Sequence, residues 1–153
     1  MTYRKVFGLE SAYEIDRPDE IPVQRTRRGA KGRGLAYEHQ VAEALPHAFH
    51  GPWYEYWDAN GRGWCQPDLV LRGSRIIVVC EVKLTWTPQA TSQLSDLYVP
   101  ILLRAHNLPV RSLIICRNLT PRVPFQVYGS MREALSSSHT IPIVHWLGHG
   151  PLV

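Results

Sequence analysis

Two acidic residues and a lysine stand at the ends of two apolar runs near the middle of the chain. Asp68 precedes residues 69–71 (LVL), and Glu81 and Lys83 follow residues 76–79 (IIVV). Carboxylates beside apolar sequence are costly to bury unless they pair or bind an ion. Mg²⁺ is bound by oxygen ligands, commonly one or two carboxylates with water and phosphate oxygens. A neighbouring lysine can orient a water molecule or a phosphate group, so these residue types fit metal-assisted hydrolysis of a phosphate ester.

The two apolar runs are expected to form an antiparallel hairpin that brings these charges together. Leucine and β-branched residues fill both runs, as in buried strands, and residues 72–75 (RGSR) have the composition of a turn. This turn places Asp68 level with the end of the second run. Because side chains alternate along a strand, Glu81 and Lys83 share one face and Val82 points to the other. The hairpin therefore predicts two carboxylates and an ammonium group at one end of a buried sheet.

The same stretch resembles the PD-(D/E)XK nuclease superfamily. Its signature here is Pro67-Asp68, then twelve residues, then Glu-Val-Lys at residues 81–83. The resemblance implies that Asp68 and Glu81 hold Mg²⁺, for which Mn²⁺ substitutes, and that the Val82 carbonyl adds a ligand. It implies that Lys83 is catalytic and positions or activates the attacking water. It also implies an α/β fold with a restriction-endonuclease-like core, a mixed central sheet flanked by helices. The alternative is a solvated ion pair at the end of a strand.

Residues 34–48 have the apolar spacing of an amphipathic helix, and Glu38 falls on its apolar side. A carboxylate on a buried helix face needs a partner, unless its stem packs while its tip reaches solvent. Many members of the superfamily carry a glutamate on this first helix, where it reaches the metal directly or through water. The resemblance therefore implies that Glu38 is a further metal ligand and catalytic residue. Pro46 is expected to disturb the end of the helix.

A basic, glycine-rich segment precedes this helix. Residues 25–33 carry five positive charges and no acid, and the charged residues are Arg25, Arg27, Arg28, Lys31 and Arg33. Such a segment fits contacts with the phosphates of DNA, and a basic linker without a specific ligand is the alternative. We expect residues 1–33 to form an N-terminal arm that contains this segment, followed by one nuclease domain over residues 34–153.

A cluster of aromatic residues precedes the core hairpin. It lies in a predicted strand, residues 53–58, and after the Asn60-Gly61 turn that follows it; its members are Trp53, Tyr54, Tyr56, Trp57 and Trp64. Packing inside the sheet explains such a cluster. A stacking surface for unpaired bases is the alternative.

A long amphipathic helix is predicted after the core hairpin, over residues 89–106, and Pro100 predicts a kink or a break within it. Some RecB-like nucleases have a glutamine and a tyrosine in this helix, separated by three residues. Here four residues separate Gln93 from Tyr98. Gln93 is assigned as a site or DNA contact, and the alternative is the ordinary polarity of a helix surface.

The remaining elements complete an α/β pattern with a mixed sheet. Residues 110–116 predict a buried strand, and residues 131–136 predict a short helix capped by Ser130. Residues 141–146 predict a late strand, placed at a sheet edge because of Pro142.

The composition fits one globular domain with an anionic partner. A chain of 153 residues suggests one domain, and its net charge of +4 favours a partner such as DNA. Three cysteines without a pairing pattern fit a reducing cytosol, and no apolar run is long enough to span a bilayer. We expect a cytoplasmic protein, nucleoid-associated or phage-encoded forms included, with no membrane partner.

These residues together predict a Mg²⁺-dependent deoxyribonuclease that hydrolyses phosphodiester bonds. The order of elements over residues 31–83 resembles archaeal-type Holliday junction resolvases. That resemblance implies selectivity for branched DNA and a homodimer, whose interface residues 143–153 are expected to supply. A repair or restriction-type nuclease without junction preference is an alternative. So are a non-catalytic nucleic-acid-binding protein on the same fold and a structural protein.

Overall fold

The protein is a mixed α/β molecule. A computed structural model describes residues 4–21, 30–124 and 126–153, with the backbone alone at Ala30 and Lys31. The elements in chain order are β1 (Ser11–Ile15), α1 (Ala30–Ala44), β2 (Phe49–His50), β3 (Trp53–Asp58), β4 (Gly61–Cys65), β5 (Leu69–Arg72), β6 (Ile77–Thr85), α2 (Pro88–Gln93), the π-helical turn η1 (Leu94–Tyr98), α3 (Val99–His106), β7 (Val110–Asn118), β8 (Val127–Tyr128), α4 (Met131–Ser136) and β9 (Ile143–His145). None of these helices is long and apolar enough to cross a lipid bilayer.

The strands of the described residues form two sheets. The smaller sheet has the order β1-β3-β4, and the larger one has the order β2-β5-β6-β7-β9-β8. β5 pairs antiparallel with β6, from Leu69 opposite Cys80 to Arg72 opposite Ile77, which confirms the predicted core hairpin. β6 is parallel to β7, and β7 is parallel to β9. The larger sheet is therefore mixed, as the sequence predicted.

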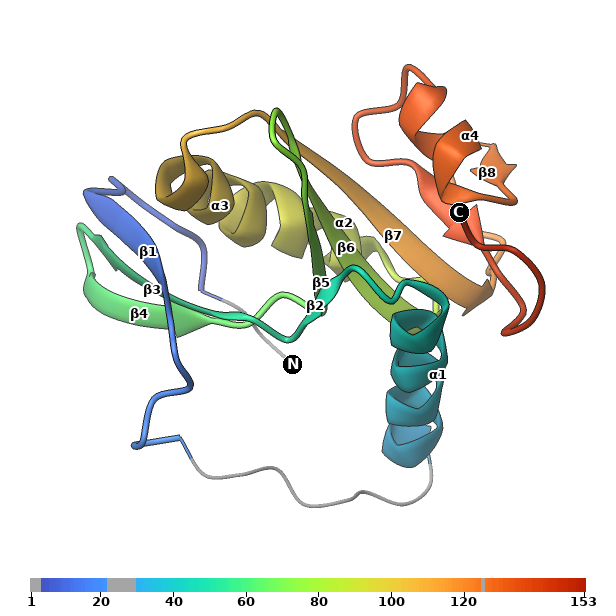
Figure 1. Ribbon diagram of the computed structural model, residues 1–153, viewed down its shortest axis with the longest axis horizontal. Coiled ribbons are helices and arrows are strands. Elements are labelled where there is room, and N and C mark those ends of the chain that lie inside the picture. Colours follow the sequence, from blue (N-terminus) through green and yellow to red (C-terminus); the bar gives the residue numbers. More distant parts are fainter. Residues whose placement is uncertain (1–3, 22–29, 125) are drawn as a thin grey trace.

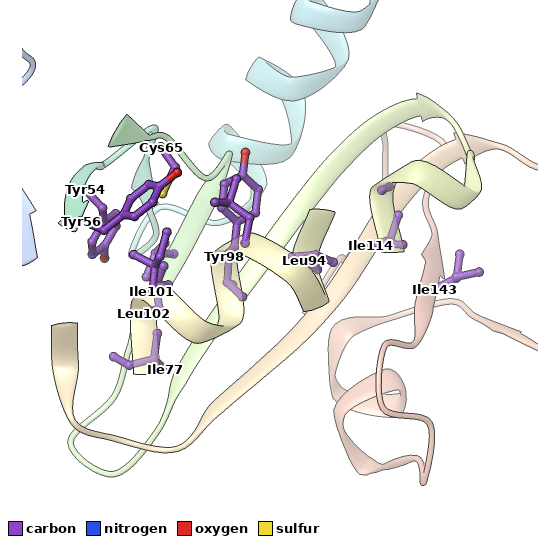
Figure 2. Packing of buried hydrophobic residues seen from close by; sticks show 14 of the residues in the cluster. Tyr54, Tyr56, Cys65, Ile77, Leu94, Tyr98, Ile101, Leu102, Ile114 and Ile143 are labelled. Atoms are coloured by element: carbon purple, nitrogen blue, oxygen red, sulfur yellow. The ribbon is translucent and has the colours of Figure 1, made fainter. Parts of the chain in front are cut away.

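Alternate residues of β6 supply two hydrophobic cores, one on each face of the larger sheet. Val79 packs with residues of α2, η1 and α3, and Figure 2 shows Tyr98 in this core between the rings of β3 and Leu94. On the other face, Cys80 and Val82 pack with residues of α1 and α4. The helices thus cover both faces of the sheet (Figure 1). Packing on both faces of the sheet therefore holds β6 in place, including the part of the strand that carries Glu81 and Lys83.

The predicted break at Pro100 takes the form of a π-helical turn. α2 passes into η1, and α3 begins at the residue before the proline. Pro100 has no N–H to donate to the carbonyl four residues earlier, which belongs to Asp96. The Val6 N–H donates to that carbonyl instead, at 3.1 Å. The break in the helix therefore provides the place where residues 4–10 attach to it.

Several boundaries differ from the expected ones. α1 begins at Ala30, so Arg33 and the expected end of the arm lie inside the helix. Within the arm, β1 pairs with β3 over its whole length. The edge position predicted for the late strand is wrong, because β9 lies between β7 and β8. Pro142 precedes β9, so its missing N–H removes no ladder bond, and its carbonyl accepts from the Ile114 N–H at 3.0 Å.

The smaller sheet encloses Tyr56 because the facing residue is a glycine. Gly63 lies opposite Tyr56 in the β3–β4 hairpin, and a Cβ at Gly63 would overlap the phenol ring. We expect Gly63→Ala to lower the free energy of unfolding by about 1–3 kcal/mol, because the buried ring must move. Urea denaturation measures this change. Gly129→Ala is the matched control, since nothing lies within 4 Å of that position, and equal losses in the two variants would contradict the explanation.

Candidate active site

The end of the β5–β6 hairpin places Asp68 opposite Glu81. Asp68 directly precedes β5, whose ladder with β6 begins at the next residue pair, Leu69 and Cys80. The Asp68 Oδ2 atom accepts a hydrogen bond from the Val82 N–H at 2.7 Å, in the place of a further backbone rung. The Asp68 carbonyl accepts from the Gly51 N–H at 2.9 Å. Hydrogen bonds therefore fix both the backbone and the side chain of Asp68.

Glu81 is a buried carboxylate with an unsatisfied oxygen. Its side chain belongs to a residue only 2% exposed, and its Oε2 atom has no hydrogen-bond partner among the described residues. Burial raises the pKa of Glu81 well above its ordinary value, and the hydrogen bond to Asp68 and the charge of Asp68 raise it further. The ammonium group of Lys83 partly offsets this rise. In the absence of a cation, Glu81 therefore favours its protonated form.

Helix α1 brings Glu38 to the same place. Burial raises the pKa of Glu38, the charge of Asp68 raises it further, and His50 and Lys83 lower it. The Glu38 Oε1 atom lies 3.0 Å from His50 Nε2. His50 was missed in the sequence, because it lies in a two-residue strand, β2, and reaches the site only through pairing with Leu69 of β5.

Lys83 lies on the same strand as Glu81, two residues further along. Its side chain lines a hollow of about 330 Å³ together with Gln93 and Tyr98. The positive charge of Lys83 lowers the pKa of both Glu81 and Glu38, so the ammonium group interacts electrostatically with the two acids. The four side chains that the sequence singled out come from α1, from the residue before β5 and from β6, and they interact electrostatically with one another.

The π turn sets the relation between Gln93 and Tyr98. Gln93 Nε2 donates to the Tyr98 hydroxyl oxygen at 2.8 Å. Residues five apart lie on different faces of a regular α-helix, but a π turn places them on one face. Burial and the charges of Glu81 and Asp68 raise the pKa of Tyr98. Tyr98 is therefore a neutral phenol in the neighbourhood of the carboxylates, and Gln93 is fixed beside it.

Part of the expected DNA-binding segment can be placed. Arg33 is exposed on α1 and lines a second hollow, of about 330 Å³, with Gln40 and Arg117. Arg117 was missed in the sequence because it follows a buried run as a single charge. The side chains of the other predicted basic residues lie outside the described part of the chain; they are Arg25, Arg27, Arg28 and Lys31.

Neither a preformed cluster of metal ligands nor similarity to a known protein identifies the site. Among the described residues, no three histidine, cysteine, aspartate or glutamate side chains are arranged so that they could hold a metal ion. No known protein family, characterised protein or solved structure matches this chain. The function is therefore inferred from the site itself.

Proposed function

We propose that the protein is a metal-dependent DNA nuclease in which Asp68 and Glu81 bind Mg²⁺. The observation that carries this proposal is that Glu38, Asp68 and Lys83 interact electrostatically with Glu81, a buried carboxylate whose Oε2 atom has no hydrogen-bond partner within the described part of the chain. Buried polar atoms are nearly always satisfied in folded proteins. A divalent cation would supply the partner that Glu81 Oε2 lacks, and it would favour the charged form of both acids.

The donor atoms fit a hard cation. Mg²⁺ commonly keeps several waters and takes only one or two carboxylates from the protein, so Asp68 and Glu81 suffice without a third acid. The Val82 carbonyl leaves β6 on the same side as the Val82 N–H, as paired strands require. That is the side on which β5 has already ended, so no β5 residue is paired with Val82. Mn²⁺ prefers the same kinds of ligand and is expected to substitute.

Each neighbouring residue then has a role in phosphodiester hydrolysis. A bound Mg²⁺ ion lowers the pKa of water and neutralises charge that develops on the phosphate. Lys83 donates hydrogen bonds to the attacking water or to the scissile phosphate. Glu38, held by His50, accepts hydrogen bonds from water near the metal. Tyr98, kept protonated by its surroundings, donates to the Gln66 carbonyl at 3.4 Å and holds the amide of Gln93 in place.

The arrangement of elements supports a restriction-endonuclease-like core as part of the proposal. The β5–β6 hairpin carries the acids, the α2–η1–α3 segment covers one face, and β7 returns parallel to β6. α1 covers the other face and contributes its glutamate at the open end of the hairpin. β5 has ended on one side of β6 at the level of these acids, and Lys83 on the same strand lines a hollow that a phosphate would enter.

DNA and a second copy of the chain are the partners that we propose. Arg33 and Arg117 supply positive charge beside α1, and charges of this kind contact DNA phosphates. Selectivity for branched DNA and a homodimer remain predictions. Exposed Leu147 and Val153 provide apolar surface in the C-terminal region expected to form the dimer.

The test is cleavage of a panel of labelled DNAs. The panel holds duplex, single-stranded, flapped and four-way DNA, each with Mg²⁺, Mn²⁺ or excess EDTA. We expect metal-dependent cleavage of at least one DNA and none in EDTA. A protein that binds these DNAs with salt-dependent affinity but cuts none of them would instead be a non-catalytic nucleic-acid-binding protein.

A further inference from the structure

The outward face of the smaller sheet carries exposed aromatic side chains. Burial alternates along β3, where Tyr54 and Tyr56 are fully buried and Trp57 is 43% exposed. The strand register places Trp57 beside Arg62, and it places Tyr13 and Trp64 on either side of Glu55. We name this surface the aromatic face, and its members are Tyr13, Trp53, Trp57, Arg62 and Trp64.

The aromatic face is not needed for the core of the sheet. The opposite face of β3 already packs into the core through its tyrosines, whereas Tyr13 is 44% exposed. The Arg62 guanidinium lies 4.8 Å from the centre of the Trp64 ring. Glu55, the acid on this face, lies 3.6 Å from Arg62 and accepts a hydrogen bond from the Tyr13 hydroxyl. The exposed rings of Tyr13 and Trp57 therefore remain open to a ligand, and the acid is paired within the protein.

The aromatic face continues into the candidate active site. β4 ends at Cys65, and two residues lead from there to Asp68. Trp64 lines the same hollow as Lys83, and Arg4 lines it as well. Within the described part of the chain, none of the side chains that line this hollow is acidic. The small sheet lies at the end of the molecule opposite α4 (Figure 1).

Exposed aromatic rings next to positively charged side chains are suited to binding unpaired nucleotides. Bases of a single strand stack on aromatic side chains, and arginine adds contacts to bases and phosphates. Bases inside a duplex are already stacked on each other and offer no free face. We infer that the aromatic face binds single-stranded DNA and guides it toward Lys83. This inference rests on the proposed nuclease function and specifies its substrate as DNA with a single-stranded tail or flap.

The test measures binding without cleavage. A fluorescein-labelled oligothymidylate of about 12 nucleotides, a length within the range that one single-strand-binding fold covers, is titrated with protein in EDTA and followed by fluorescence anisotropy. We expect Trp57→Ala and Trp64→Ala each to weaken binding about tenfold, within the range measured for base–aromatic stacking. Trp57→Phe keeps a ring and should restore most of the affinity.

Matched controls separate stacking from general damage. Leu103→Ala removes another exposed apolar side chain, on α3, and Arg132→Ala removes an exposed arginine on α4; both should bind like the parent. Arg62→Ala should weaken binding, unlike Arg132→Ala. Unchanged affinity in both tryptophan variants would overturn the inference. An equal loss on blunt duplex would also overturn it, because the face would then hold paired DNA.

Two further outcomes keep this inference distinct from the nuclease proposal. If no DNA is cut with any metal but the tryptophan variants still lose single-strand affinity, the aromatic face stands and the nuclease proposal fails. If Trp57→Ala instead dissociates a dimer in sedimentation and leaves DNA affinity unchanged, a second copy of the chain covers the face and the inference fails.

Discussion

Replacing Lys83 with alanine is expected to lower the rate of metal-dependent DNA cleavage by about 10²–10³-fold, the usual cost of losing one group that stabilises a transition state. Lys83 is the ammonium group beside Glu81 and Glu38, and an alanine cannot donate to the water or the phosphate. Glu81→Gln should cause a loss of at least this size, because the amide removes the charge that holds the cation. Single-turnover cleavage at saturating protein and Mg²⁺ measures both rates.

The control for these variants is Glu43→Gln on α1. Glu43 is an exposed acid on the same helix as Glu38, so its loss changes net charge without touching the site. We expect Glu43→Gln to cut at the parent rate. If Lys83→Ala cuts as fast as the parent, Lys83 has no part in the chemistry. If Glu43→Gln loses as much as Glu81→Gln, net charge rather than the site governs cleavage.

The same Glu81→Gln variant is expected to be more stable than the parent when metal is absent. Burial and Asp68 raise the pKa of Glu81 in the folded protein, so the folded state holds a proton that the unfolded chain releases. The contribution of Glu81 to stability is therefore fully present below the ordinary glutamate pKa, and it is lost as the pH rises through the raised pKa. At pH 8 in EDTA, Glu81→Gln should therefore stabilise the fold, because the amide needs no proton in order to be buried without charge.

Urea denaturation at pH 5 and pH 8 measures this effect. The parent should lose more stability than Glu81→Gln between the two values, although Glu38 contributes a change in the same direction in both proteins. Adding Mn²⁺ at about 100 times its dissociation constant should stabilise the parent by about 2.7 kcal/mol and Glu81→Gln by much less. If the free energy of unfolding changed identically with pH in the two proteins, this would contradict a raised pKa for Glu81 in the folded state.

The hairpin and its charges could be predicted because they depend on local sequence. Two apolar runs and one turn fix the register of β5 and β6. Alternation along one strand then fixes which charged residues share a face. Glu38 could be found as well, since helical spacing alone places it on the buried side of α1.

Other features depend on contacts between distant segments and could not be read from the sequence. β1 pairs with β3 across 38 to 46 residues, from Ile15 opposite Trp53 to Ser11 opposite Trp57, and no local pattern specifies that partner. His50 meets Glu38 only because β2 pairs with β5. The edge position for β9 was predicted from Pro142 alone, and the neighbouring strand β8 has only two residues.

The aromatic cluster could be interpreted from its composition either as core packing or as a stacking surface. The alternation of side chains along β3 shows which residues serve the core. Tyr54 and Tyr56 point into the core, as packing predicted, and Figure 2 shows their rings beside Cys65. Trp57, on the same strand, points outward. Core packing therefore accounts for part of the cluster, and only its outward members are open to a ligand.

The π turn between α2 and α3 shows that two groups can keep the same distance in space when the number of residues between them changes. The wider turn absorbs one additional residue, and the amide of Gln93 still meets the hydroxyl of Tyr98. A chain one residue shorter, with a regular helical pitch, would bring the same two groups together. Sequence patterns that prescribe a fixed count between a glutamine and a tyrosine thus discard proteins in which the pair is intact, whereas a search by interatomic distance retains them.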